Sequence, residues 1–170
     1  LHAWDALGMP GLLRRLGFNE AQVRAAAVLV TSRLHEPMSE NALVHWLPFS
    51  SLPDLLGPDV LRGGTDRYYR AGDLLFDGAA AIEHHLNERV GRHFGLKRSI
   101  RLYDLTNFHF EGVCAANPKA RRGVNKQKRS DCPQVVLGLV FDECGFVLAH
   151  NIFAGNTSDA KTLPEMVKTM

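Results

Sequence analysis

The chain lacks the features that define several large classes of protein. Its three cysteines, Cys114, Cys132 and Cys144, form no C-x-x-C pair, and their odd number argues against a disulfide scaffold. No apolar run approaches the length of a membrane span, and no signal peptide, repeat or low-complexity tract is visible. We therefore expect a protein of the reducing cytoplasm without a membrane partner.

One segment also lacks acidic residues altogether. Residues Lys119 to Arg129 carry +6, whereas the remaining residues sum to −4, a contrast hidden by the net charge of +2. The basic side chains of this segment, named here the basic loop, are Lys119, Arg121, Arg122, Lys126, Lys128 and Arg129. Such a cluster suits the phosphate oxygens of DNA, although a solvated loop that prevents aggregation would have the same composition.

A single carboxylate stands in the strand-like stretch before this loop. Ile100, Leu102 and Asp104 alternate along one face of the predicted strand, and Tyr103 and Leu105 make the other face apolar as well. We therefore expect Asp104 to occupy a buried position, where a carboxylate costs several kcal/mol unless cations or donors meet it. Asp104 is either a metal ligand held on a rigid sheet or a strand-end residue that caps the next turn.

After the basic loop, the pattern predicts a β-hairpin. Two apolar, β-branched runs, Gln134 to Phe141 and Phe146 to Ala154, flank a short turn that ends in Gly145. Asp142 is interpreted as a residue of that turn and Asp131 as a cap or loop anchor. The order is therefore an acid-bearing strand, a basic loop and a hairpin.

The first 97 residues are predicted to be helical. Asn19 has the character of an N-cap for a helix over Ala21 to His35, and Ser39 and Ser51 begin two short helices. A longer helical stretch runs from Thr65 to about Phe94, where Gly95 ends it. The expected fold class is α+β, with a helical region over 1–97 and a region of antiparallel strands over 98–170.

The ordered set of motifs over the last part of the chain resembles the DDE-type transposases of bacterial insertion sequences, in particular the insertion-sequence-four group. The matching stretches are YDLTN around Asp104, the G-x-x-K-x-x-R-x-D-C-P-Q pattern of Gly123 to Gln134, the hairpin, and FAGNTSDAKTL from Phe153 to Leu163. The helical part before residue 98 resembles the family's N-terminal region with far weaker motifs, and this resemblance implies DNA binding or assembly as the role of residues 1–97.

The resemblance implies a ribonuclease H-like catalytic domain, of which 98–170 is the beginning, and DNA transposition as the activity. Asp104 corresponds to the first catalytic Asp and thus to a ligand of Mg²⁺, while the second Asp and the Glu are expected beyond Met170. Two Mg²⁺ ions cannot be organised by one carboxylate, so we expect the 170-residue chain alone to be inactive. DNA is the implied partner of the basic loop, and a homo-oligomer is possible. An exposed apolar face is expected where later elements are missing.

Two alternatives remain open. The chain could be a catalytically silent DNA-binding remnant of such an enzyme. Asp104-Leu105-Thr106 also matches a D-x-T nucleophile motif of haloacid-dehalogenase-like phosphatases, but these enzymes need a parallel sheet with crossover helices, whereas the hairpin demands antiparallel strands.

Overall fold

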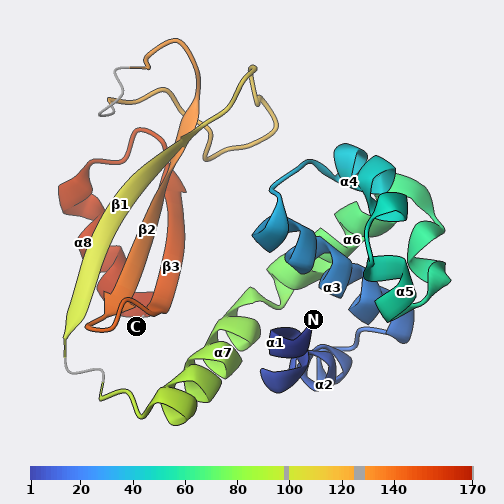
Figure 1. The fold of residues 1–170 in the computed structure, drawn as a ribbon. Helices are drawn as coiled ribbons and strands as arrows, with labels where there is room; N and C mark the ends of the chain where they lie inside the picture. The colour runs from blue at the N-terminus through green and yellow to red at the C-terminus, as the bar shows by residue number, and fades with distance from the viewer. Residues whose placement is uncertain (98–99, 125–128, 170) are drawn as a thin grey trace. The chain divides into compact units, whose positions relative to one another are not determined.

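A computed structural model describes residues 1–97, 100–124 and 129–169. The fold is α+β, as predicted: helices come first, followed by an antiparallel sheet of three strands and a last helix (Figure 1). The chain forms two compact units, Leu1–Arg89 and Val90–Met170. The change from helices to strands lies between Phe94 and Arg101, where the sequence places it.

The first unit is built from short helices with identifiable caps. Asn19 and Gln22 form a complete capping box at the start of α3, and the Ser39 side chain accepts a hydrogen bond from the Ala42 amide at the start of α4. These two helix starts confirm the predicted ones. The helices are α1 (His2–Ala6), α2 (Met9–Arg15), α3 (Glu20–His35), α4 (Glu40–Trp46), α5 (Leu52–Leu56), α6 (Gly64–Asp77) and α7 (Ala79–Phe94), with 3₁₀ turns η1 (Leu47–Phe49) and η2 (Pro58–Leu61).

The long helical stretch predicted up to Phe94 is divided into α6 and α7 at Gly78. A Cβ atom at Gly78 would lie 3.2 Å from the Leu16 Cδ1 atom, so glycine allows the chain to pass close to this side chain. Apolar residues of both helices, Leu75 of α6 and Ile82 and Leu86 of α7, lie against the buried cluster around Leu13. Gly95 follows the helix with a positive φ of 60°, which confirms it as the stop.

A second buried cluster in this unit gathers around Tyr68 of α6. Its members come from α3 to α6 and the two 3₁₀ turns, and include Val28, Leu43 and Val60. The Tyr68 hydroxyl is buried with them and donates a hydrogen bond of 2.6 Å to the Val60 carbonyl oxygen. Burial raises the pKa of this phenol. Tyr68 thus fastens η2 to α6 through a satisfied polar contact inside an apolar cluster.

The second unit contains the sheet. Strand β1 (Arg101–His109) pairs antiparallel with β2 (Gln134–Asp142), which pairs antiparallel with β3 (Val147–Ala154). The predicted hairpin is therefore confirmed, with the strand of Asp104 beside it. Asp142 closes the turn by accepting hydrogen bonds from the amides of Cys144 and Phe146, as its interpretation as a turn residue requires.

Helix α8 (Asp159–Thr169) covers one face of this sheet (Figure 1). Met166 of α8 is fully buried against Val140, Ala149 and Phe153. The opposite face carries Leu102, Phe108 and Val147 with about half of each side chain exposed, which confirms the expected exposed apolar face.

Two further expectations concern absences. The three cysteines, all within the described residues, are free. Among the helices of the described residues, none is both long and apolar enough to cross a membrane.

We predict that Tyr68→Phe lowers the free energy of unfolding by about 1–2 kcal/mol, because it leaves the buried Val60 carbonyl without its side-chain donor. Tyr69→Phe is the matched control, since Tyr69 is half exposed on the same helix and should change stability by less than about 0.5 kcal/mol. Urea unfolding of both variants measures the difference, and equal midpoints and slopes would contradict the role given to Tyr68.

Candidate functional site

Asp104 lies in the middle of β1, directly opposite Leu139 of β2, which in turn lies opposite His150 of β3. Its side chain shares a face with Leu102 and Thr106 rather than with Tyr103 and Leu105. Among the residues of the three strands, Asp104 is the one carboxylate on that face. The acid is therefore fixed on a paired strand, with the apolar side chains of Leu102 and Leu139 beside it.

The prediction that Asp104 is buried is wrong, because the residue is exposed. The reason is that α8 packs on the other face and β1 forms an edge of the described sheet. An exposed carboxylate carries no large desolvation penalty, so burial does not demand a metal or a cation here. What remains is a carboxylate held by a strand that is paired along its whole length.

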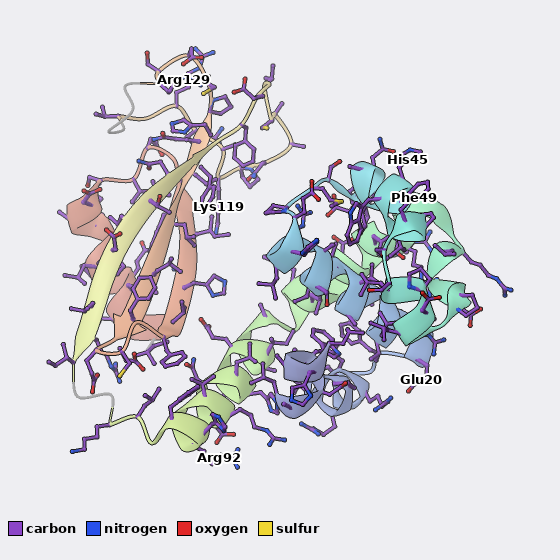
Figure 2. All side chains as sticks on the ribbon, in the orientation of Figure 1. Glu20, His45, Phe49, Arg92, Lys119 and Arg129 are labelled. Carbon is purple, nitrogen blue, oxygen red and sulfur yellow. The ribbon has the colours of Figure 1, made fainter. Side chains whose placement is uncertain are left out.

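The start of the basic loop is tied to the sheet through its main chain. Arg121 exchanges two backbone hydrogen bonds, each of 3.0 Å, with Gln134 at the beginning of β2. The Lys119 Nζ atom donates to the Ile152 carbonyl oxygen at 2.6 Å, and Figure 2 labels this side chain beside the sheet. Arg122 is exposed. Lys126 and Lys128 lie outside the described residues.

Arg129, labelled in Figure 2 at the end of the basic loop, forms ion pairs with carboxylates. Its guanidinium donates two hydrogen bonds of 2.8 Å to the two oxygens of Asp131, and the Glu111 carboxylate lies 3.6 Å away. The hydrogen bond from Arg129 lowers the pKa of Asp131. Asp131 is thus a loop anchor, as the sequence suggested, and a phosphate at Arg129 would compete with these carboxylates.

Three residues from two of the motifs, Gly123 and Gln134 of one and Gly155 of the other, meet where the basic loop passes the turn between β3 and α8. The fully buried Gln134 donates from Nε2 to the Gly155 carbonyl oxygen at 2.7 Å. A Cβ atom at Gly155 would overlap the carbonyl oxygens of Gln134 and Arg121, and one at Gly123 would overlap the Gly155 carbonyl oxygen. Sequence reasoning expected Gly123 to let the basic loop adapt to a DNA backbone and gave Gly155 no role, so it did not foresee that both glycines permit this close approach within the chain.

These elements border one open hollow of about 1140 Å³ at the edge strand β1. Asp104 and Asn107 come from β1, and Gly123 and Val124 come from the basic loop. The segment that enters α8 adds oxygen-bearing side chains, those of Asn156, Thr157, Ser158 and Asp159. The hollow lies on the α8 face of the sheet, where Asn107 lies, and Asp104, whose side chain belongs to the other face, borders it at the edge strand β1. The basic loop contributes two uncharged residues to its lining, Gly123 and Val124.

Asp159 is a second carboxylate of this hollow that sequence reasoning did not assign. It lies in the first turn of α8, within the motif FAGNTSDAKTL, and that motif is the one signal in the sequence that could have drawn attention to it. The described residues contain no group of three or more acidic, histidine or cysteine side chains placed to hold a metal ion.

Comparisons with known proteins assign the chain to no family. No family model, no curated protein and no solved structure matches the chain.

We predict that Gln134→Leu lowers the free energy of unfolding by about 1–3 kcal/mol, because the Gly155 carbonyl loses its buried donor. The control is Asn156→Ala, which changes an exposed neighbour in the same turn and should alter stability by less than about 0.5 kcal/mol. Thermal unfolding compares the two variants. A Gln134→Leu protein as stable as Asn156→Ala would rule out the importance of this junction.

Proposed function

We propose that the chain contributes the first catalytic carboxylate, Asp104, and a DNA-contacting loop to a DDE-type transposase with a ribonuclease H-like catalytic domain. The observation that carries this proposal is that Asp104 and two residues of the basic loop, Gly123 and Val124, border the same hollow. Phosphodiester chemistry needs a carboxylate for the metal and cations for the DNA backbone, and the cations Arg121 and Arg122 directly precede Gly123 in the sequence. Cytoplasmic location and bacterial DNA as partner follow from the same proposal.

The order of the strands supports the same reading. An acid in the first strand, two further antiparallel strands and then a helix is the arrangement that the resemblance implies for the opening of the catalytic domain. A haloacid-dehalogenase-like phosphatase fits less well, because β1 pairs antiparallel with β2 and no parallel pair occurs among the described strands.

The donors around the hollow suit Mg²⁺, which prefers oxygen ligands and keeps several of its waters. Asp104 would be its ligand, whereas the other oxygen donors of the hollow, Asn107 and Asp159, lie on the opposite face of β1 and in the first turn of α8. When bound, Mg²⁺ activates the attacking oxygen and stabilises the leaving one. The role of the chain's own residues is positional: the paired strand β1 fixes the Asp104 carboxylate, and the basic loop holds the phosphate backbone beside it.

Further carboxylates are needed for cleavage. The described residues hold no group of three metal-binding side chains, and the resemblance assigns the second Asp and the Glu to positions beyond Met170. A silent DNA-binding remnant is the second candidate function, favoured by this same observation. The two candidates share the basic loop and differ in what Asp104 does.

We predict that the chain binds duplex DNA without sequence preference, with log K falling against log salt at a slope no steeper than about −5 if all of the basic loop's cations meet phosphates. Replacement of Arg121, Arg122, Lys126 and Lys128 by Ala should weaken binding uniformly across sequences and flatten this slope. Fluorescence anisotropy at several salt concentrations measures both quantities. Unchanged affinity in a folded variant would place the DNA site elsewhere.

We predict that Asp104→Asn abolishes Mg²⁺-dependent cleavage of a transposon-end duplex by a protein extended to include the second Asp and the Glu, while DNA binding persists. The change preserves the shape of the side chain and removes the charge that holds the metal. Asp131→Asn and Asp142→Asn are the controls, since these residues anchor the loop and close the hairpin turn, and their variants should retain substantial activity. Full activity of Asp104→Asn would refute the catalytic assignment.

A further inference from the structure

A second hollow, lined by positively charged side chains, lies in the helical unit, away in sequence from Asp104 and the basic loop. It has a volume of about 730 Å³, and four arginines line it: Arg24, Arg62, Arg67 and Arg70. Two carboxylates, Asp59 and Asp66, line it as well, so the side chains sum to a charge of +2. All these residues belong to the compact unit Leu1–Arg89, and we call this site the arginine hollow.

One of the arginines has a structural role. The Arg67 guanidinium donates to the carbonyl oxygens of Asp59, Arg62 and Ala21, the last two at 3.0 and 3.2 Å. These bonds join the turn η2 and the segment before α6 to the first turn of α3. Arg67 therefore holds together the segments that line the hollow, and the donors that make these bonds are occupied by main-chain oxygens.

The other three arginines are incompletely neutralised. Asp59 is shared between Arg24, at 3.7 Å, and Arg62, at 3.3 Å. The Arg24 Nε atom is buried without a hydrogen-bond partner among the described residues, although a buried donor normally has one. Arg70 is exposed, and no carboxylate is within ion-pair distance of it in the described part of the chain. The Asp59 carboxylate thus forms ion pairs with two guanidinium groups, those of Arg24 and Arg62, and the Arg70 guanidinium lines the same hollow.

Two helices also begin at this hollow. Asn19, Ala21 and Gln22 belong to the N-terminal end of α3, and Gly63 and Asp66 to that of α6. The amide ends of helices carry a partial positive charge that favours anions. The packing of α3 against α6 in Figure 1 brings these two ends to one place, and both add to the field of the arginines.

We propose that the arginine hollow is a binding site for a phosphate group, held by Arg24, Arg62 and Arg70 between the N-terminal ends of α3 and α6. Guanidinium groups match the geometry of phosphate oxygens and bind them in pairs of parallel hydrogen bonds. The phosphate is carried either by a nucleic-acid backbone or by a small phosphorylated compound. The site does not depend on the function proposed for Asp104, because it lies in the other compact unit.

The test uses the whole chain in which the four basic-loop residues are already replaced by Ala, so that the loop does not contribute. Titration with inorganic pyrophosphate and, separately, with a short DNA duplex distinguishes the two carriers. We expect Arg62→Gln combined with Arg70→Gln to raise the dissociation constant of whichever probe binds by about tenfold or more. Arg14→Gln combined with Arg15→Gln is the matched control, because it removes the same charge from α2, outside the hollow.

Asp66→Asn provides a test in the opposite direction, since it removes a carboxylate from the hollow and leaves every arginine in place. This variant should bind the same probe more tightly. It decides the question if circular dichroism shows that the variants without Arg62 and Arg70 do not fold.

If the Arg62→Gln, Arg70→Gln variant loses pyrophosphate binding, the ligand is a small phosphorylated compound. If this variant loses only duplex binding, the ligand is a nucleic acid. Absence of binding to both probes, or equal effects of the two arginine pairs, would overturn the proposal.

Discussion

Pairing of β1 with β2 along all nine residues of β1 is the constraint on which the candidate site depends. Because side chains alternate between the faces of a strand, this register decides that Asp104 and Tyr103 lie on opposite sides of the sheet. A shift of one residue would place Asp104 beneath α8, among apolar side chains. The register therefore keeps the acid accessible to ligands and to solvent.

The covering of one face by α8 follows from the same alternation. Val140, Ala149 and Phe153 point to the face on which Met166 is buried, and together these side chains form the buried cluster of this unit. The other face has no such cover in the described part of the sheet and exposes Leu102 and Phe108. A continuous exposed apolar face is typical of a surface that another element or another protein covers.

Much of the fold could be predicted from local signals. Capping residues such as Asn19 and Ser39 mark helix starts by their own hydrogen bonds, and the alternating runs around Gly145 mark the hairpin. The break at Gly78 escaped prediction because its cause, the approach of Leu16, comes from a residue distant in sequence. A single glycine within a helical pattern does not reveal which distant side chain will approach it in the folded chain.

The candidate site could be predicted only in part. The position of Asp104 in a strand was correct, but its exposure was not, since β1 is apolar on both faces and the sequence cannot reveal which face α8 covers. The junction of Gly123, Gln134 and Gly155 depends on segments far apart in sequence that approach only in the folded chain. The arginine hollow has the same origin, because Arg24 and Arg70 belong to different helices.

The central claim is that DNA held by the basic loop lies beside Asp104. The most direct measurement attaches an iron chelate that cleaves DNA locally to a cysteine introduced by Asp104→Cys, with Cys114 and Cys144 changed to Ser and the buried Cys132 retained. The account predicts cleavage of a bound duplex from position 104 and none when the chelate is attached through Val167→Cys, an exposed position on α8, which covers the opposite face of the sheet. Cleavage from position 167 without cleavage from position 104 would contradict it.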